Sequence, residues 1–281
     1  MRITASTPLF ALLGNPTRQS LSPILHNGWI EEHGFDGAYV ALCSPVEQFE
    51  TALSGLFQAG LQCANITSPF KERAVLQATQ LTASALACQS VNCLTPSADG
   101  LIGDSTDGRG LLADLDARAK HWRQMSGHIV ILGAGGAARD LLHALYQAGF
   151  TKIDVVNRNF ERAKTMIENL NTESVRARTW TDMADSLSGA SLIINASRAG
   201  FGGLDDFAPN FSKTLPDALV YDMVYAPQQT LFLSTAQANK RMTLGGLGML
   251  VGQGALAFEN WFGVRPDLLT GLSRLEAELK L

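Results

Sequence analysis

The stretch His128-Ile-Val-Ile-Leu-Gly133-Ala-Gly135-Gly136-Ala-Ala-Arg139 decides the fold of this chain. The apolar run before the glycines predicts a buried strand, and the apolar-periodic run after them predicts a helix that ends at Gly149. A second apolar run, Ile153-Asp-Val-Val156, predicts the next strand. Strand, glycine-rich turn, helix and strand, in this order, form the unit that binds a dinucleotide pyrophosphate on a helix N-terminus.

The glycine-rich turn contains the first candidate ligand contacts. Gly133 and Gly135 permit a tight turn and a close approach of phosphate to the backbone. The spacing Gly-x-Gly-Gly-Ala is a variant of the Gly-x-Gly-x-x-Gly fingerprint, and an ordinary strand-to-helix turn is the alternative. The candidate cofactor contacts in this turn are Gly133, Ala134, Gly135, Gly136 and Ala137.

The end of the second strand indicates which dinucleotide is bound. An NAD site usually has Asp or Glu there to bind the ribose hydroxyls, whereas this chain has Asn157 followed by Arg158 and, in the next helix, Arg162. Guanidinium groups offer a charged fork of donors that suits a 2′-phosphate, so the sequence predicts NADP (NADPH) as cofactor. The alternative is that Arg162 pairs with Glu161 or Glu168 on a solvated helix.

The composition is that of a globular, enzyme-sized protein. Its 281 residues are enough for two domains, and 46% of them are apolar. The net charge of −4 and the pI near 5.7 argue against a nucleic-acid partner, which needs a basic face. We expect a small-molecule substrate, no nucleic-acid partner, and a monomer or homodimer.

Neither a membrane span nor a metal site is predicted. No apolar run approaches membrane-spanning length, and residues 1–15 lack the basic region and cleavage site of a signal peptide. The four cysteines show no Cys-x-x-Cys spacing, so we expect reduced thiols packed in the core. The histidines show no metal-ligand spacing either, and the sequence predicts a cytoplasmic protein without a bound metal.

The first part of the chain alternates short strands with helices. Strands are predicted at residues 9–13, 38–42 and 63–67, helices at 46–58 and 79–88, and a hairpin at 91–94 and 101–103 with a loop longer than two residues. From about residue 111 a helix leads into the next domain. Residues 1–110 are therefore predicted to form an N-terminal α/β domain.

Polar residues near two predicted helix starts are candidates for a site. Ser22 and Ser68 each precede a proline, which predicts that they are N-caps, whereas Ser20 has no such structural explanation and could face a polyol. Lys71 falls in a first helical turn, where the macrodipole disfavours a cation by several tenths of a kcal/mol or so. Such a misfit marks a candidate functional residue, although pairing of a solvated Lys71 with Glu72 is the alternative.

The hairpin brings a further carboxylate into consideration. It places Asn92 near the turn Asp104-Ser105-Thr106-Asp107-Gly108. Asp107 can simply cap the following helix, and a functional role requires that it face Lys71.

The second part of the chain reads as a doubly wound parallel sheet. Strands are predicted at residues 129–132, 153–156, 175–178, 192–196, 219–223 and 241–244, with helical runs between most of them. Ligands gather at the carboxyl ends of such strands. The candidates at these ends are Ser197, Val224 and Tyr225. Residues 111–244 are therefore predicted to form a Rossmann-like NADP-binding domain.

The run Gly245-Gly246-Leu247-Gly248-Met249 follows the last strand and opens a helix over residues 249–261 that carries Gln253. A glycine cluster lets a flat cofactor ring lie against the backbone, so Gly246 and Met249 are candidate cofactor contacts. Met249 as core filler is the alternative. A last helix is predicted at residues 266–279, and residues 245–281 are expected to return to the first domain.

Taken together, these segments resemble the shikimate dehydrogenase family and its quinate-using relatives over nearly the whole chain. Besides the turn at Gly133, the motifs are Gly14-Asn-Pro, Ser20-x-Ser22-Pro, Asn65-Ile-Thr67-x-Pro69-Phe-Lys71, Val91-Asn92, Thr106-Asp107-Gly108-x-Gly110, Asn157-Arg158, Asn195-Ala-Ser197-x-x-Gly200, Tyr221-Asp222-Met-Val-Tyr225-x-Pro227 and Gly248-Met-Leu-Val-x-Gln253. Their number and order make the combination far more specific than any one of them.

The resemblance implies an NADP-dependent oxidoreductase of aromatic amino acid biosynthesis, with a cleft between a substrate-binding catalytic domain and the Rossmann-like domain. It implies that Lys71 and Asp107 form the catalytic pair in the reversible reduction of 3-dehydroshikimate to shikimate. The substrate contacts that it implies are Ser20, Ser22, Thr67, Asn92, Gln253 and Tyr225.

The chain departs from the usual family pattern at Gln19, Cys93, Ser105 and Gly246. The family usually has His, Thr and Asn at the first three positions and often has an acidic residue at the fourth. All four lie near motifs that shape the substrate or nicotinamide site. Quinate or an amino-substituted shikimate therefore stays open as the natural substrate.

Two other function classes compete with the dehydrogenase. One is a non-catalytic, ligand-sensing relative, which the presence of Lys71, Asp107 and the turn at Gly133 argues against. The other is a Rossmann dehydrogenase that acts on a folate or an amino acid, which the motifs at Ser20–Ser22 and Thr67–Lys71 argue against.

Overall fold

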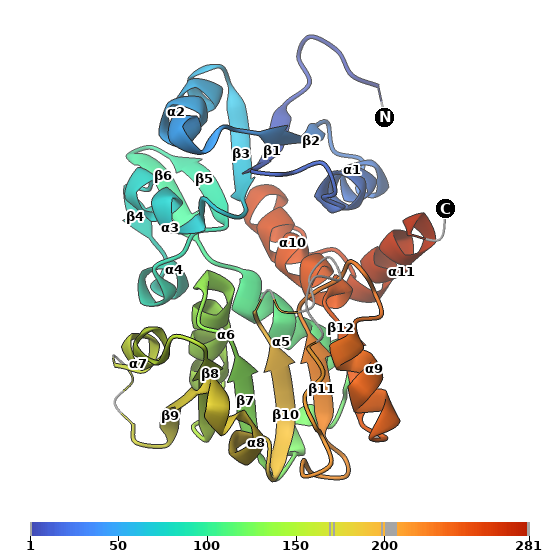
Figure 1. Ribbon diagram of the computed structural model, residues 1–281. Coiled ribbons are helices and arrows are strands. Elements are labelled where there is room, and N and C mark those ends of the chain that lie inside the picture. The colour runs from blue at the N-terminus through green and yellow to red at the C-terminus, as the bar shows by residue number, and fades with distance from the viewer. Residues whose placement is uncertain (1, 169, 171, 198, 200–206, 280–281) are drawn as a thin grey trace. The chain divides into compact units, whose positions relative to one another are not determined.

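The computed structural model describes residues 2–168, 170, 172–197, 199 and 207–279 (Figure 1). The chain divides into two compact units: Met1–Gly110 with Leu250–Leu281, and Leu111–Met249. Gly200, the last residue of one family motif, lies outside the described residues. In the part of the chain that is described, no helix has the length and apolar character needed to cross a bilayer.

The first unit contains a mixed six-stranded sheet with the order β2-β1-β3-β5-β6-β4. Its strands are β1 (Leu9–Gly14), β2 (Ala38–Cys43), β3 (Leu61–Ile66), β4 (Gln80–Leu81), β5 (Cys93–Ser97) and β6 (Gly100–Asp104). β1 pairs in parallel with β2 and β3, whereas β5 is antiparallel to β3 and β6. Because β5 runs in reverse, its first residue lies beside the last residues of β3 and β6, at one edge of the sheet.

Helices cover both faces of this sheet. They are α1 (Ser22–Glu32), α2 (Phe49–Gln58), α3 (Lys71–Ala74), α4 (Ala83–Cys88) and α11 (Leu268–Glu278), with 3₁₀ turns η1 (Val46–Gln48) and η2 (Val75–Gln77). Successive residues of β1 point to opposite faces. Leu13 packs with Phe49 and Leu53 of α2, whereas the ring of Phe10 lies against Trp261 of α10 (Leu247–Phe262).

Two predicted N-caps of the first unit are wrong. Helix α1 begins at Ser22 itself and its cap residue, Leu21, is already helical (φ −87°, ψ −4°), so no side chain caps the helix. The Ser20 hydroxyl instead accepts a hydrogen bond from the Ser22 amide at 3.3 Å. Helix α3 begins at Lys71 with Phe70 as cap residue, so Ser68 lies too early to cap it.

Two other boundaries also differ from prediction. The segment predicted as a helix over residues 79–88 starts as strand β4, and α4 follows after Thr82, whose hydroxyl accepts from the Ala85 amide at 3.3 Å. Ser97 pairs directly with Gly100, so the hairpin loop has two residues and is shorter than predicted. Gly100 makes this tight turn possible because its φ is +126°, a region that favours glycine.

The second unit contains the predicted parallel sheet, with the order β12-β11-β10-β7-β8-β9. Its strands are β7 (His128–Leu132), β8 (Ile153–Asn157), β9 (Val175–Thr179), β10 (Ala190–Asn195), β11 (Leu219–Asp222) and β12 (Met242–Gly245). All neighbouring pairs are parallel. The chain order reverses between β7 and β10, which is the arrangement of dinucleotide-binding sheets.

Helices lie on both faces of the parallel sheet, so the predicted doubly wound fold is confirmed. They are α6 (Gly136–Gln147), α7 (Phe160–Ile167), α8 (Met183–Ser186) and α9 (Leu231–Ala238), with η3 (Trp122–Gln124) and η4 (Trp180–Asp182). On one face Ile131 packs with Leu141 of α6, and on the other Val130 packs with Phe232 of α9. Helices α5 (Asp107–Arg118) and α10 each begin in one unit and end in the other.

A histidine lies in the aromatic core of the first unit. The His26 ring stacks on Tyr39 with centroids 4.2 Å apart and contacts the rings of Trp29 and Trp261. Its two ring nitrogens have no hydrogen-bond partner among the described residues. Burial lowers the pKa of His26 from 6.5 to about 3, because the cation would lose its hydration.

We expect His26 to make the protein sensitive to acid. Below about pH 6.5 the unfolded chain protonates this imidazole, whereas the folded protein does not until about pH 3, so stability falls with pH across this window. At about pH 5 the loss amounts to ~2 kcal/mol. Chemical denaturation of His26→Phe at about pH 7 and about pH 5 should show a smaller loss than the wild type.

The exposed His121 provides the matched control, since His121→Phe should keep the acid sensitivity of the wild type. An equal loss of stability in His26→Phe and wild type between the two pH values would contradict the assignment.

Candidate active site

The candidate catalytic residues of the first unit meet beyond the last residues of β3 and β6, where β5 begins. Lys71, the first residue of α3, has its ammonium nitrogen 2.5 Å from Oδ2 of Asp107, the first residue of α5. The Asp107 side chain is 5% exposed, whereas the Lys71 side chain is 23% exposed. The carboxylate at the start of α5 is favoured by the helix macrodipole, and it compensates for the cation at the start of α3.

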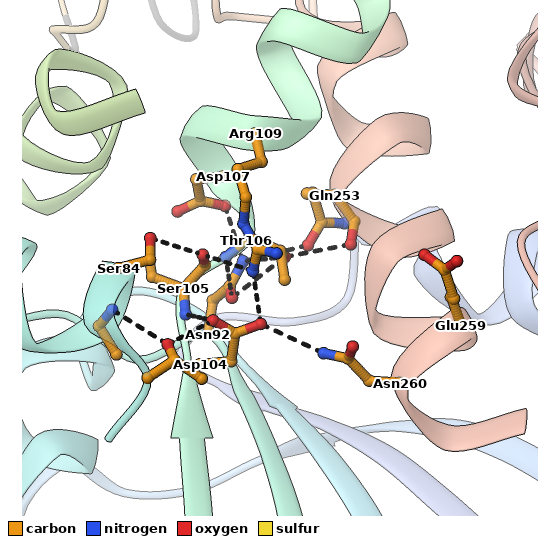
Figure 2. Close-up of polar contacts among 12 residues, drawn as sticks. Ser84, Asn92, Asp104, Ser105, Thr106, Asp107, Arg109, Gln253, Glu259 and Asn260 are labelled. Carbon is orange, nitrogen blue, oxygen red and sulfur yellow. Dashed lines mark hydrogen bonds and ion pairs between the residues drawn. The ribbon is translucent and has the colours of Figure 1, made fainter. Parts of the chain in front are cut away.

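The side-chain amide of Asn92 connects this ion pair to the turn before α5 (Figure 2). Its Nδ2 group donates to Asp107 Oδ1 and to the Thr106 hydroxyl, both at 2.9 Å, while its Oδ1 accepts from the Thr106 amide at 2.9 Å. Both oxygens of the Asp107 carboxylate are therefore held, one by Lys71 and the other by Asn92.

Helix α10 contributes Gln253 to the same group (Figure 2). Its Oε1 accepts from Asn92 at 3.3 Å, and its backbone oxygen accepts from the Thr106 hydroxyl at 3.1 Å. The helices can approach this closely because Gly110 has no side chain, since a Cβ there would lie 2.7 Å from Cα of Gln253. The structure thus brings together Lys71, Asn92, Asp107 and Gln253, and adds Thr106, which was not among the candidates.

The predicted substrate contacts Ser20 and Ser22 lie where β1 leads into α1, and a chain of polar contacts connects Ser22 to Asn92. Tyr39, whose pKa burial raises well above its usual value, contacts Ser22 and donates to Asn65 Oδ1 at 2.9 Å. Asn65 in turn donates to the Asn92 carbonyl at 3.0 Å.

Sequence reasoning did not single out Tyr39 or Asn65 as part of the site. A fully buried amide inside the apolar strand Cys63-Ala-Asn-Ile66 was a usable signal for Asn65, because buried polar groups need partners. Tyr39 gave no such signal. Thr67, the remaining candidate on this side, donates its amide to the Leu13 carbonyl at 2.9 Å and so ties the end of β3 to β1.

One departure from the family pattern, Cys93, points away from this group. Cys93 and Asp104 are cross-strand partners on β5 and β6, so their side chains share the face opposite to that of Asn92. Burial, and then the charge of Asp104, raise the pKa of the Cys93 thiol to about 12. Neither a thiol nor a hydroxyl at position 93 can therefore contact the Lys71 group directly.

Behind the turn, Asp104 holds the segment that carries Asp107 (Figure 2). Its carboxylate accepts from the Thr82 hydroxyl at 2.6 Å, from Arg109 at 2.5 Å and from the Ser105 amide at 2.8 Å. Ser105, another departure, has its carbonyl bound by Arg109. These residues fix the backbone of the turn from the side opposite to Asn92.

In the second unit the glycine turn after β7 leaves open space above the N-terminus of α6. Gly133 has φ +115°, and a Cβ there would lie 3.0 Å from the Ala196 backbone, so this glycine is needed for the turn itself. Gly135, the cap residue of α6, has ordinary extended backbone, and a Cβ there would meet nothing within 4 Å. Gly136 and Ala137 are the first residues of the helix.

The candidate 2′-phosphate contacts follow β8. Asn157 ends the strand and donates its side-chain amide to the Asn159 carbonyl at 2.9 Å, and the Asn159 side chain caps α7 by accepting from the Arg162 amide. Arg162 therefore lies in the first turn of α7, whereas Arg158 precedes the helix. The Arg158 guanidinium lies over the ring of Trp180, 5.3 Å from its centroid.

Two buried side chains organise the ends of β10 and β11. Asn195 Oδ1 accepts from the amide and hydroxyl of Ser197, and its Nδ2 donates to Asp222 at 3.0 Å. Asp222 also accepts from the Val224 amide at 3.1 Å and from Thr230. Burial raises the pKa of the Asp222 carboxyl, and these hydrogen bonds oppose the shift.

The turn after β12 contains the last candidates, Gly246 and Met249. A Cβ on Gly246 would lie 3.0 Å from Cα of Met223, so this position has no room for a side chain. At Gly245 the nearest neighbours of a Cβ lie 3.7 Å away, and a side chain fits there. In this structure an acidic side chain would therefore fit at position 245 but not at position 246.

The candidates thus form two groups, one in each unit. The cofactor candidates follow the carboxyl ends of β7, β8, β10, β11 and β12, at one edge of the parallel sheet. Tyr225 follows β11 in the second unit, whereas the other substrate candidates belong to the first, and burial raises its pKa. Among residues that the structure places, no three His, Cys, Asp or Glu side chains could hold a metal ion.

These features define a two-unit α/β protein whose second unit has the Rossmann-type fold. Residues 12–94 match the family model of the shikimate dehydrogenase substrate binding domain, residues 117–200 that of shikimate / quinate 5-dehydrogenase, and residues 246–270 that of the shikimate 5'-dehydrogenase C-terminal domain. The chain belongs to the shikimate dehydrogenase family.

Individual relatives match along almost their whole length. The shikimate dehydrogenase (NADP(+)) of Rhodospirillum rubrum is 40% identical over 270 residues, which cover 95% of each chain. The protein of the same name from Gluconobacter oxydans is 39% identical and covers 98% of this chain and 100% of its own. The crystal structure of shikimate 5-dehydrogenase from Thermus thermophilus in complex with NADP(H) and shikimate has a TM-score of 0.85 at 30% identity, covering 96% of this chain and 99% of that one.

Alanine substitutions at Gly133 and Gly135 should differ in their effect on stability, because only Gly133 is needed for the shape of the turn. Gly133→Ala should lower the free energy of unfolding by roughly 2 kcal/mol, because the positive φ and the contact with Ala196 both disfavour a Cβ. Gly135→Ala should leave it unchanged within about 0.5 kcal/mol, since alanine fits there. Urea titration of both variants tests this, and equal destabilisation would contradict it.

Proposed function

We propose that this chain is an NADP-dependent shikimate dehydrogenase that catalyses the reversible reduction of 3-dehydroshikimate to shikimate. The observation that carries the proposal is the ion pair between Lys71 and Asp107, bound by Asn92 in a unit that matches the family's substrate binding domain. Relatives of this name match over 95% or more of the chain.

In the proposed mechanism Lys71 moves the proton. One N–H of its ammonium is donated to Asp107, and the others are available to the carbonyl oxygen of the substrate. When bound, NADPH supplies the hydride that converts the substrate carbonyl to a hydroxyl. Lys71 gives its proton to that oxygen in reduction and takes it back in oxidation, while Asp107 orients the ammonium and stabilises its charge.

Neutral donors and acceptors then hold the substrate ring. Its hydroxyls and carboxylate suit the hydroxyls of Ser20, Ser22 and Thr67 and the amides of Asn92 and Gln253, which we propose as the binding set. All five belong to the first unit. Because Cys93 pairs with Asp104 across β5 and β6 and not with this group, this departure gives no reason to prefer quinate or an amino-substituted substrate.

The residues of the second unit fit a dinucleotide. The open space at Gly135 and the first amides of α6 suit a pyrophosphate, which the helix N-terminus attracts. Arg158 and Arg162 suit the 2′-phosphate of NADP, and Asn157 puts no carboxylate near it. We propose Ser197, Val224, Gly246 and Met249 as the remaining contacts of this cofactor.

We also propose a cytoplasmic location, as expected for an enzyme that uses the cellular NADPH pool. The four cysteines are free thiols, and three of them are buried, in agreement with a reducing compartment. A fluorescent fusion observed in the source cell would test this, and export of the fusion would contradict it.

The substrate and cofactor can be tested together by following the nicotinamide absorbance band. Wild-type protein should oxidise shikimate with NADP⁺ much faster than with NAD⁺, and faster than it oxidises quinate. Arg158→Ala should raise the KM for NADP⁺ roughly tenfold or more, because a charged hydrogen bond to the 2′-phosphate is lost, and should leave the KM for NAD⁺ unchanged.

Arg123 is the matched control for Arg158, because it also stacks on a tryptophan, Trp122, and lies in the same unit. Arg123→Ala should leave both KM values unchanged. A wild-type preference for NAD⁺ would contradict the cofactor, preference for quinate would contradict the substrate, and no turnover of either would favour a ligand-sensing relative.

Replacing Lys71 tests the proton transfer. Lys71→Ala should lower kcat by roughly 10²- to 10⁴-fold with little change in the KM for shikimate, because proton transfer acts in the transition state. An added primary amine should restore part of the rate.

The exposed Lys120 provides the control, and Lys120→Ala should behave as wild type. Unchanged kcat in Lys71→Ala would remove Lys71 from the mechanism.

A further inference from the structure

A buried ion pair lies beneath the turn Gly245–Met249 of the second unit. The Asp114 carboxylate is completely buried and accepts two hydrogen bonds from Arg118, one turn later on α5, with Nε 2.5 Å from Oδ1. Arg118 also donates to the Gly245 carbonyl at 3.1 Å. The ion pair therefore binds the first residue of the turn.

Tyr221 of β11 connects the same ion pair to the other end of the turn. Its hydroxyl donates to Asp114 Oδ2 at 2.6 Å and accepts from the Met249 amide at 3.1 Å. Tyr221 is fully buried, and burial followed by the charge of Asp114 raises its pKa well above the usual value, so the hydroxyl keeps its proton. One hydroxyl thus bridges the ion pair and the backbone of the turn.

The backbone of the turn is closely packed at two of its glycines. A Cβ on Gly248 would overlap the Asp114 carboxylate, so the backbone rests directly on that side chain. Gly246 is likewise pressed against the Met223 backbone. Close contact on both sides, together with hydrogen bonds at both ends, gives the turn a single position relative to the edge of the parallel sheet.

We propose that Tyr221, held by Asp114 and Arg118, is a positioning residue that sets where the Gly245–Met249 turn holds the nicotinamide. This inference rests on the proposed function, because contact of Gly246 and Met249 with the cofactor is part of that proposal. Tyr221 is completely buried and would act through the Met249 amide.

The kind of interaction supports positioning rather than stability as its main role. A buried ion pair gains little over apolar side chains of the same volume, because its desolvation offsets the attraction. Its hydrogen bonds, in contrast, are directional, and an apolar core cannot orient two backbone groups of a turn. Hydride transfer depends on such orientation, since small misplacements of the reacting atoms cost large factors in rate.

The isosteric change Tyr221→Phe tests the proposal because it removes only the bridging hydroxyl. We expect kcat for shikimate oxidation to fall roughly 10- to 100-fold, while the KM for NADP⁺, which phosphate contacts dominate, changes less than about threefold. The primary isotope effect with shikimate deuterated at the reacting carbon should increase, because hydride transfer becomes more rate-limiting. The Kd for NADP⁺, measured by calorimetry, should stay near the wild-type value.

Tyr146 of α6 gives a matched control in the same unit. No described residue hydrogen-bonds to its hydroxyl, and Tyr146→Phe should leave kcat, KM and the isotope effect unchanged. A second variant, Arg118→Lys, keeps the charge beside Asp114 but cannot reach both Asp114 and the Gly245 carbonyl. It should lower kcat in the same direction as Tyr221→Phe.

A purely structural role for Tyr221 makes a different prediction. In that case Tyr221→Phe would unfold at a lower temperature, while kcat per folded molecule and the isotope effect would equal those of the wild type, and the inference would be overturned. Absence of shikimate oxidation by the wild-type protein would instead overturn the proposed function, so the two failures are distinguishable.

Discussion

The geometry of the candidate catalytic group depends on the side-chain amide of Asn92. A carboxylate as buried as Asp107 is tolerated only if both oxygens are paired, and Lys71 alone reaches one of them. Asn92 binds the other and accepts from the Thr106 amide, so a single amide determines both the charge pairing and the backbone of the turn. Its own backbone is in turn fixed between β3 and β6, because its amide donates to Asp104 and its carbonyl accepts from Ile66.

In the second unit, buried carboxylates hold the backbone that follows two of the strands. Asp222 accepts hydrogen bonds from Asn195, Thr230 and the backbone after β11. Asp114 accepts from Tyr221 and Arg118, which in turn bind the turn after β12. In both cases a loop at the carboxyl edge of the sheet is held by charge-assisted hydrogen bonds, which are shorter and stronger than neutral ones. The residues directly after β11 and the turn after β12 are therefore attached to the sheet by buried side chains of the chain itself.

How much of this could be read from the sequence differs between strands, helix starts and side-chain contacts. The four central parallel strands, β7, β8, β10 and β11, were predictable because strands buried on both faces are largely apolar runs. The N-caps at Ser22 and Ser68 were not, because a cap depends on backbone angles that neighbouring segments decide; Leu21, for example, is already helical. The contact between Lys71 and Asp107 required knowledge of the reversed direction of β5, and the sequence predicted only a hairpin without its partner strand.

The strand register also explains which departures from the family pattern matter. Asn92, directly before β5, binds Asp107, whereas the next residue, Cys93, is the first of β5 and pairs with Asp104. A position adjacent in sequence to a substrate candidate can therefore change without changing what the substrate would meet. Gln19 differs from these, because it is exposed and directly precedes Ser20. Cys93 is also next to a member of the proposed binding set, Asn92, but it pairs with Asp104 inside the sheet, whereas Gln19 lies in an exposed turn outside the sheet.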